Sequence, residues 1–198
     1  MILSKLFKKV FLTESNKEFP KTVALVGGSF KPPHAGHWYM VEQYAKKADE
    51  VVVLISDPKS AKSIRKTSAG TVITAEMAKE IFDIYIKRYN LTSKVKAIIS
   101  AEPSPITALF KYVDDSLNDV NVIFGVSKKD DDLKRFKSAQ KYYEENEHIH
   151  LIDPAETAVE PYVDKHGNNI SATNVRNNIE NPEVIKSYLP EKLTPEDV

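Results

Sequence analysis

Two histidines, His34 and His37, stand three residues apart after a glycine-rich turn, and their position suggests chemistry on phosphate groups. The apolar run Val23–Gly27 before the turn predicts a buried strand, and the apolar spacing after His37 predicts a helix. The N-terminus of a helix presents unpaired N–H groups and the positive end of the helix dipole, which together attract phosphate. Because imidazoles there can donate further hydrogen bonds, the segment Gly28–His37 predicts a site for a polyphosphate.

A second polar group lies near the other end of the chain, in the segment Ile170–Arg176. Ser171 is suited to cap a helix, and Thr173 falls in the first turn of that helix, where backbone N–H groups are free. Arg176 follows within about one and a half helical turns of Ser171. Hydroxyls, amides and a guanidinium in this arrangement suit anionic oxygens, although a serine-capped helix with an arginine is by itself an ordinary feature.

The elements around these segments predict an α/β fold, a Rossmann-like open parallel sheet with helices on both faces. Thr74 is expected to cap a helix whose apolar stripe includes Met77, and Ser171 to open a last helix that ends near Asn181. Further strands are expected at 51–56, 95–99, 120–126 and 149–152, further helices at 106–117 and from about 130 to 143, and a long irregular connection at 153–170. Ligands of such sheets bind beyond the carboxyl ends of the strands, where the strand order reverses.

Composition limits the classes of protein to which the chain can belong. The 28 Lys and Arg residues balance the 28 Asp and Glu residues, which argues against a protein that coats nucleic acid. Without cysteine the chain has neither disulfides nor thiolate metal sites. It has no long apolar run that would span a membrane and no convincing secretory signal, so we expect a cytoplasmic protein.

We expect two parts, an amphipathic N-terminal extension over residues 1–21 and one domain over residues 22–198. In the extension, apolar residues such as Leu6 and Phe7 fall on one helical face, with Lys5, Lys8 and Lys9 on the other. Such a helix can lie on a membrane surface, but short segments rarely bind membranes unaided. We expect it to pack on its own domain or across the interface of a homo-oligomer rather than to bind a membrane.

Taken as a pair, the two polar segments resemble the motifs of the HxGH nucleotidylyltransferase superfamily. This family includes nicotinamide-mononucleotide and pantetheine-phosphate adenylyltransferases and the cytidylyltransferases. The sequence GSFKPPHAGH matches a G-S-F-x-P-x-H-x-G-H pattern after a strand, and ISATNVR matches I-S-x-T-x-x-R at a helix start. The resemblance covers about residues 22–180 and implies the Rossmann-like fold of the family.

The resemblance also implies a reaction and its participants. A phosphate oxygen of a small phosphorylated acceptor attacks the α-phosphorus of a nucleoside triphosphate, ATP or CTP bound with Mg²⁺, and pyrophosphate leaves. The implied catalytic residues are His34, His37 and Arg176, and the implied nucleotide-binding residues are Gly28, Ser29, Phe30, Lys31, Gly125, Ser127, Ser171 and Thr173. No protein metal ligands are implied, because phosphates and water supply most of the ligands of Mg²⁺.

Two departures leave details of this site open. Ser127 stands where the family often has the Asp of a Gly-x-Asp pattern, and Lys31 stands where the nicotinamide-mononucleotide enzymes carry other residues.

The loop Asp57–Gly70 contains Lys59, Lys62, Arg65 and Lys66 and is either a clamp for the acceptor's phosphate or a solvated loop.

The residues are compatible with one expected function and two alternatives. The arginine that ends the second motif resembles the adenylyltransferase branch, so we expect adenylyl transfer to a phosphate-bearing acceptor such as nicotinamide mononucleotide. Cytidylyl transfer from CTP is the first alternative. A catalytically silent module that binds nucleotide is the second, but it would not need both histidines together with Arg176.

Overall fold

The computed structural model describes residues 19–58, 60, 63–128, 132–164 and 166–198. The first half contains β1 (Thr22–Gly28), α2 (Ala35–Ala45), β2 (Glu50–Ser56), β3 (Arg65–Lys66), β4 (Val72–Ile73), α3 (Ala75–Arg88), β5 (Val95–Ser100) and α4 (Pro105–Ser116). The second half contains β6 (Val120–Phe124), α5 (Asp132–Tyr143), β7 (Ile149–Leu151), α6 (Pro154–Thr157), α7 (Ala172–Asn178), α8 (Pro182–Ile185) and the short 3₁₀ helices η2 (Lys186–Tyr188) and η3 (Pro195–Asp197). Most of the predicted N-terminal extension, residues 1–18, lies outside the described residues.

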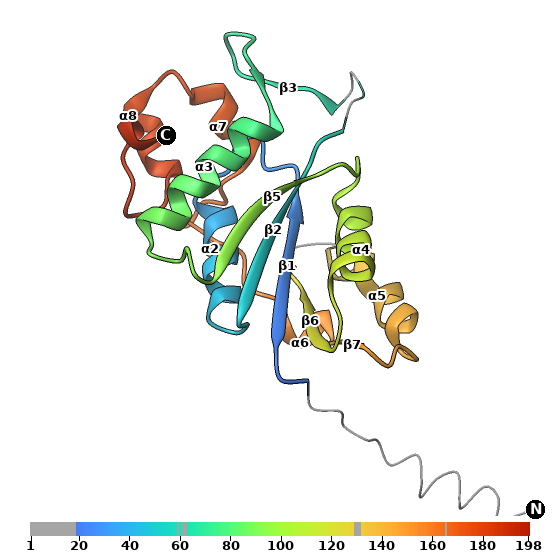
Figure 1. The fold of residues 1–198 in the computed structure, drawn as a ribbon. Helices are drawn as coiled ribbons and strands as arrows, with labels where there is room; N and C mark the ends of the chain where they lie inside the picture. The colour runs from blue at the N-terminus through green and yellow to red at the C-terminus, as the bar shows by residue number, and fades with distance from the viewer. Residues whose placement is uncertain (1–18, 59, 61–62, 129–131, 165) are drawn as a thin grey trace, which may run out of the picture.

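The main sheet has five parallel strands in the order β5-β2-β1-β6-β7 (Figure 1). The chain builds β1, β2 and β5 in one direction and then returns to add β6 and β7 on the other side of β1. The strand order therefore reverses between β1 and β6, and the carboxyl ends of these two strands are where such a sheet binds its ligands. This confirms the predicted Rossmann-like sheet.

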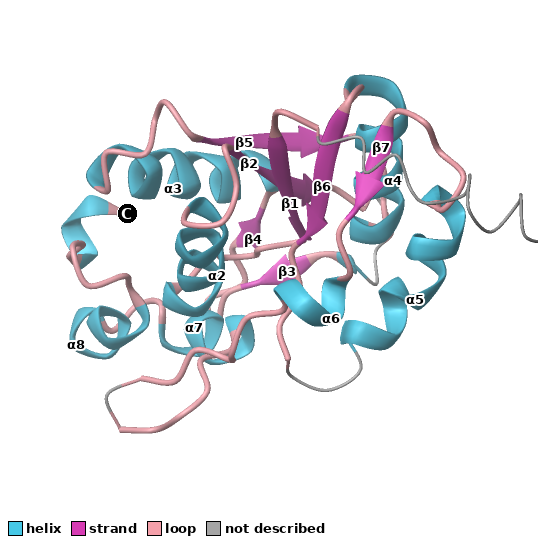
Figure 2. Cartoon of the chain, turned by 90° about the horizontal axis from the view of Figure 1, so that it is seen from below, coloured by secondary structure: helices cyan, strands magenta, loops and turns pink. Residues whose placement is uncertain are grey.

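Alternate residues of β1 pack into two cores, one on each face of the sheet. Ala24 and Val26 pack with α2 and α3, whereas Val23 and Leu25 pack with α4 and α5. Figure 2 shows the two groups of helices on opposite sides of the strands. Because both faces are covered, every strand residue in the middle of β1 and β2 is buried, which explains why these strands are continuous apolar runs.

Four predictions about the elements need correction. The helix that Ser171 opens ends at Asn178 and is not the last one, because the Asn181 side chain accepts a hydrogen bond from the Val184 N–H and starts α8. The connection 153–170 is not wholly irregular, since it contains α6, and the loop Asp57–Gly70 includes β3. Met77 is 41% exposed and does not belong to the buried stripe of α3, which runs through Ala75, Ala78, Phe82, Tyr85 and Ile86.

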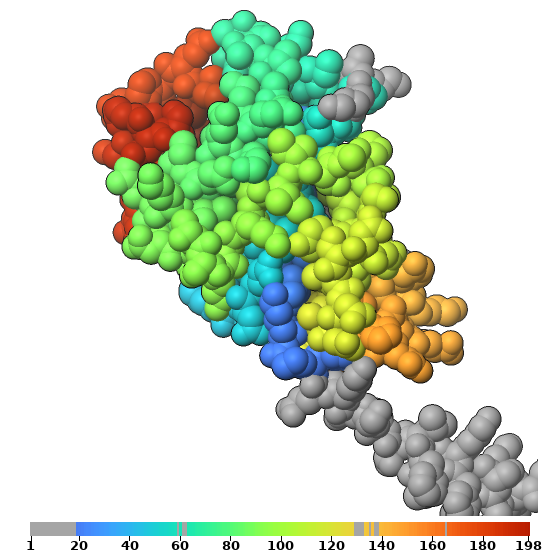
Figure 3. All heavy atoms as spheres, in the orientation of Figure 1, coloured from blue at the N-terminus to red at the C-terminus, as the bar shows by residue number. Residues whose placement is uncertain are grey.

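The C-terminal segment packs along α3, as Figure 3 shows for the red and green surfaces. Leu193 is buried in the core that α2 and α3 share. The Lys192 ammonium lies 4.7 Å from the centre of the Tyr89 ring, and Arg88 pairs with Asp197. In the described part of the chain, no helix is both long enough and apolar enough to cross a membrane.

Tyr44 of α2 forms hydrogen bonds with the segment that directly follows β6, near the carboxyl edge of the sheet. Its buried hydroxyl donates a hydrogen bond to the Val126 carbonyl and accepts one from the Val126 N–H, both at 2.9 Å. Gly125 lies against the same ring, and a Cβ atom there would come within 2.9 Å of the Val26 side chain. The segment that leads into Ser127 is therefore held by packing and by a side chain of α2.

We expect Tyr44→Phe to lower the free energy of unfolding by about 2 kcal/mol, because it leaves the buried Val126 N–H without an acceptor, although the Val126 carbonyl keeps a hydrogen bond from the Val159 N–H. Urea unfolding followed by circular dichroism measures the change. Tyr142→Phe is the control, since Tyr142 is 63% exposed and its hydroxyl reaches Asp114 only at 3.4 Å. Equal losses for the two variants would contradict a special role of the Tyr44 hydroxyl.

Candidate active site

The turn after β1 is shaped by the ring of Phe30. Phe30 has a positive φ of 49°, and its ring packs edge-on against His37 at 5.0 Å and against Phe82 at 5.1 Å between centroids. A Cβ atom at Gly28 would lie 2.6 Å from this ring, so only glycine fits there. Gly28 and Phe30, which the family resemblance assigns to nucleotide binding, support the position of His37 in this structure.

His34 caps α2 with its own ring. Its Nδ1 accepts a hydrogen bond of 3.1 Å from the Gly36 N–H, which leaves Nε2 as the N–H donor of a neutral ring. The ring of His37 stacks on that of His34 with centroids 3.7 Å apart. His37 Nδ1 is buried and has no hydrogen-bond partner within the described part of the chain. Two imidazoles thus lie together at the N-terminus of a helix, where a phosphate is favoured.

Both histidines are neutral at physiological pH. Burial lowers the pKa of His34 from its ordinary value of 6.5 to about 4. Burial, and the nearby His34 to a smaller extent, lower the pKa of His37 well below the same value. The pair therefore offers hydrogen-bond donors to an anion, and the positive charge of the site has to come from other residues.

The second motif lies against the first. Ser171 caps α7, and its hydroxyl accepts a 3.2 Å hydrogen bond from the Asn174 N–H. The Arg176 guanidinium donates one hydrogen bond of 2.8 Å to the Lys31 carbonyl, 145 residues away, and another of 2.8 Å to the Thr173 hydroxyl. The structure thus brings together the two segments that the sequence places at opposite ends of the domain.

The β3–β4 hairpin adds positive charge beside Arg176. The Ser68 N–H donates a 3.2 Å hydrogen bond to the Arg176 carbonyl, which attaches the hairpin to α7. Burial lowers the pKa of Arg176, and the charge of nearby Arg65 lowers it further. Two guanidinium groups that lie close to one another favour an anion between or beside them. Lys59 and Lys62 of the predicted clamp lie outside the described residues.

A cavity of about 270 Å³ opens between α2 and the segment 159–172. Four of the residues predicted from the sequence line it, His34, His37, Ser127 and Ser171. The others are not among its lining residues: Gly28, Ser29, Phe30, Lys31, Gly125, Thr173 and Arg176. The predicted set therefore divides into residues that face the cavity and residues that build the turn and the contact between the motifs.

The residues predicted from the sequence did not include the aromatic wall of this cavity. Tyr39 and Tyr162 approach each other with ring centroids 5.5 Å apart, and Met40 lies beside them on the lining. Tyr39 and Met40 follow His37 on α2, so helical spacing could have placed them near the site. Tyr162 carries no such signal, because its position depends on how the connection 153–170 folds back over α2.

Ser127 joins that connection to the sheet. It forms a β-bridge with Val159, and the next residue, Lys128, pairs with Glu160 at 2.5 Å. Val159, Glu160, Ser127 and Ser171 all line the cavity. Ser127, which follows β6, thus lines the cavity, and a serine stands where the family pattern often has an aspartate.

The described residues of the site suit Mg²⁺ that is bound to a phosphate ligand. The described residues contain no group of three or more His, Asp or Glu side chains placed to hold a metal ion. Mg²⁺ commonly keeps several waters and takes one or two carboxylates plus substrate phosphates. The donor set of the site, with imidazoles, hydroxyls and guanidinium groups, suits the phosphates of such a complex rather than the ion alone.

Comparisons with known proteins give a family for the chain and solved structures of similar fold. A model of the cytidylyltransferase-like family matches residues 25–178. Among solved structures, a proposed nicotinate-nucleotide adenylyltransferase from Vibrio parahaemolyticus is similar at 19% identity and a TM-score of 0.53, with 89% of both chains covered. A search of the curated proteins found no match.

Two further solved structures are similar over part of their length. A bifunctional NMN adenylyltransferase/ADP ribose pyrophosphatase from Francisella tularensis gives 13% identity and a TM-score of 0.54, over 85% of this chain and 45% of the other. NadR protein in complex with NR gives 18% identity and a TM-score of 0.52, over 87% of this chain and 44% of the other. This chain spans less than half of either, and at such identities the likeness shows the fold alone.

Burial of neutral His34 makes stability depend on pH. Because the pKa of His34 is about 4 in the folded chain and its ordinary value is 6.5, the unfolded chain binds the proton more tightly. Stability is therefore highest above about pH 6.5 and falls as the pH decreases toward 4. We expect protonation of His34 in the unfolded chain to lower the free energy of unfolding by about 2 kcal/mol as the pH falls from 7 to 5.

Urea unfolding at a series of pH values measures this loss. His34→Asn keeps a good helix cap but does not titrate, so we expect the variant to lose less stability over the same interval. Some loss should remain because His37 is also buried. An unchanged pH dependence in His34→Asn would show that His34 is not buried as a neutral ring.

Proposed function

The chain belongs to the cytidylyltransferase-like family, within the HxGH nucleotidylyltransferases, and we propose that it transfers an adenylyl group from ATP to a phosphate-bearing acceptor. Nicotinamide mononucleotide is the acceptor that the similar solved structures suggest, since the Francisella protein is described as an NMN adenylyltransferase. Pyrophosphate is the second product. Transfer of a cytidylyl group from CTP is the alternative, which the name of the family favours.

The observation that carries this proposal is the contact between the two motifs. The Arg176 guanidinium of α7 donates a hydrogen bond to the carbonyl of Lys31 in the first motif. His34, His37 and Ser171 line one cavity. A silent nucleotide-binding module would need neither the stacked imidazoles nor this arginine at the same place. The arrangement supports a site where phosphates of one nucleotide contact both motifs.

The proposed step needs no protein nucleophile. An oxygen of the acceptor's phosphate attacks the α-phosphorus, a new P–O bond forms, and the bond from the α-phosphorus to the bridging oxygen breaks as pyrophosphate leaves. The imidazoles donate hydrogen bonds to oxygens on which charge develops, and Arg176 stabilises the departing pyrophosphate. Positioning of the two substrates contributes the rest of the rate enhancement.

Mg²⁺ would enter with the triphosphate, held by phosphate oxygens and water, and would neutralise charge on the leaving group. The residues of this chain act around it: His34 and His37 orient the α-phosphate, and Arg176 with the hydroxyls of Ser171 and Thr173 binds the distal phosphates. The protonation of the histidines agrees with this assignment, because neutral rings donate from one nitrogen each without competing with the metal for phosphate charge.

The assay that tests the proposal follows pyrophosphate release with Mg²⁺. ATP and CTP are each combined with nicotinamide mononucleotide, phosphopantetheine, glycerol phosphate and choline phosphate. We expect release with ATP and one acceptor, and ATP analogues to bind at least about tenfold more tightly than CTP analogues by calorimetry, a difference of about 1.4 kcal/mol. Preference for CTP would move the protein to the cytidylyl alternative, and no release with any pair would contradict the proposal.

His37→Ala tests the role of the imidazole in turnover. The N–H groups at the start of α2 remain in this variant, so ATP affinity should change little, whereas kcat should fall by about 10²–10³ because a preorganised donor is lost. Steady-state pyrophosphate release gives kcat, and titration with ATP gives the affinity, on protein whose melting temperature is checked first. A near wild-type kcat would exclude His37 from catalysis.

A further inference from the structure

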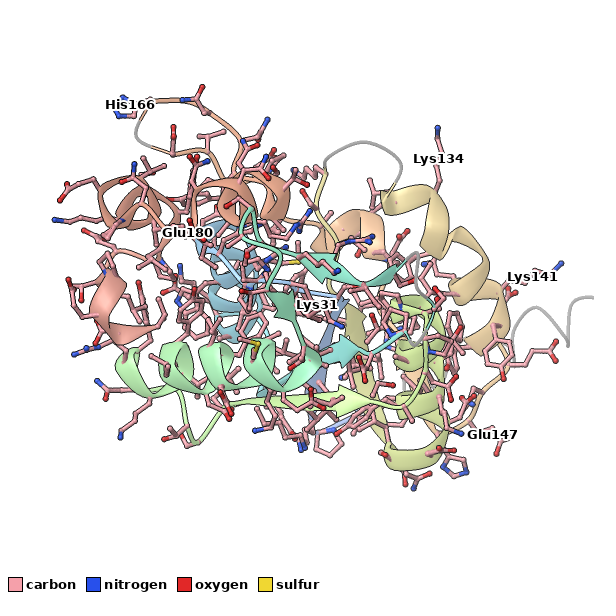
Figure 4. All side chains as sticks on the ribbon, turned by 90° about the horizontal axis from the view of Figure 1, so that it is seen from above. Lys31, Lys134, Lys141, Glu147, His166 and Glu180 are labelled. Atoms are coloured by element: carbon pink, nitrogen blue, oxygen red, sulfur yellow. The ribbon has the colours of Figure 1, made fainter. Side chains whose placement is uncertain are left out.

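The side chain of Lys31 points away from the nucleotide cavity. Lys31 belongs to the first motif, but it does not line the cavity, and its ammonium reaches Asp57 Oδ1 at 3.2 Å, directly after the end of β2. In the view onto the carboxyl ends of the strands, Figure 4 shows Lys31 near the middle of the molecule, whereas Lys134 and Lys141 point outward. A cation therefore lies over the β1–β2 side of the sheet.

This ammonium is buried with few partners. Lys31 is 6% exposed, and removal of an ammonium from water costs several kcal/mol unless hydrogen bonds replace the lost hydration. Within the described part of the chain, Asp57 is its one hydrogen-bond partner, so two of its three N–H donors remain for other acceptors. An arrangement of this kind is suited to a second anion.

The surroundings of Lys31 can take the oxygens of a phosphate group. The hydroxyls of Ser29 and Ser56 lie 3.1 Å apart where β1 and β2 end, and Ser56 is fully buried. Arg176 donates to the carbonyl of Lys31, so the backbone that carries the ammonium is held in place by the second motif. The two hydroxyls thus lie at the ends of β1 and β2, next in the sequence to the segments that carry Lys31 and Asp57.

The chemistry of the proposed reaction needs a separate cation for the acceptor. In an in-line displacement the attacking oxygen and the leaving oxygen lie on opposite sides of the α-phosphorus. The groups that bind the leaving pyrophosphate therefore cannot also hold the attacking phosphate. Arg176 bonds to Thr173 of the second motif, whereas the Lys31 ammonium is directed toward β2.

We propose that Lys31 binds the phosphate of the acceptor and that Asp57 balances its charge until that phosphate takes the place of the carboxylate. This inference rests on the proposed function and deepens it, because it selects acceptors that carry a phosphomonoester. It assigns Lys31 to the binding of the acceptor, whereas the family resemblance assigns this residue to the binding of the nucleotide. Asp57 is a competitor of the acceptor in this arrangement, which gives the two residues opposite effects on acceptor binding.

Variants of the two residues separate this arrangement from a merely structural ion pair. We expect Lys31→Met to raise the KM of the acceptor by at least about tenfold, because a charge-assisted hydrogen bond is lost, with the affinity for ATP changed less than about twofold. Lys31→Arg should restore most of the acceptor affinity. Asp57→Asn should lower the KM of the acceptor even if the melting temperature falls. Lys79→Met, which removes an exposed pair with Asp83 on α3, is the control.

Several results of these kinetic measurements would overturn the proposal. An unchanged acceptor KM in Lys31→Met, equal losses for ATP and acceptor, or a raised acceptor KM in Asp57→Asn would each show that the pair serves the fold. Lys31→Met should fold, because the Asp57 carboxylate that loses this partner is 18% exposed and keeps contact with water. If it does not, Lys31→Gln is measured against the same expectations.

A binding measurement distinguishes failure of this inference from failure of the proposed function. Calorimetry with nicotinamide mononucleotide, which needs no turnover, should show binding to the wild type that weakens at least about tenfold in Lys31→Met and strengthens in Asp57→Asn. If the wild type releases no pyrophosphate but shows this pattern, the proposed function is wrong and the phosphate site stands. If the wild type turns over and binding does not depend on Lys31, or if it binds no phosphomonoester at all, the site is wrong.

Discussion

One hydrogen bond, from the Arg176 guanidinium to the Lys31 carbonyl, connects the two halves of the site. The guanidinium donates to two neutral acceptors, this carbonyl and the Thr173 hydroxyl. These hydrogen bonds fix its position, and its positive charge is not neutralised by a carboxylate. An ion pair with a carboxylate would have fixed the arginine equally well but cancelled the charge that attracts phosphate. The contact thus joins α7 to the turn after β1 and preserves the electrostatic field of the site.

The division of charge within the site follows from burial. The histidines lie so deep that desolvation lowers their pKa values, and they act as neutral donors at the start of α2. Arg176 donates hydrogen bonds to neutral groups only, and the charge of Arg65 lies nearby. A chain with no net charge can therefore place two guanidinium groups near one another beside the two motifs.

The sequence predicted those parts of the fold that depend on short-range patterns. The strands around β1, the Thr74 cap of α3 and the Ser171 cap of α7 all follow from residues within one turn or one strand. Tyr162 and the pair of Lys31 with Asp57 depend on elements far apart in the chain, and no local pattern indicates them. Met77 was misplaced because apolar spacing does not show which edge of an amphipathic helix faces solvent.

The same distinction separates the parts of the site. Groups directed at phosphate come from two short motifs whose geometry is nearly local, since a cap or a turn places each side chain. The wall opposite α2 is different, because the Ser127–Val159 bridge and the Tyr44 hydroxyl hold it through contacts between distant segments. Substitutions in residues 159–170 can therefore reshape that wall without moving His34, His37 or Arg176. A resemblance carried by the motifs consequently indicates phosphate chemistry well and says far less about which base or acceptor is chosen.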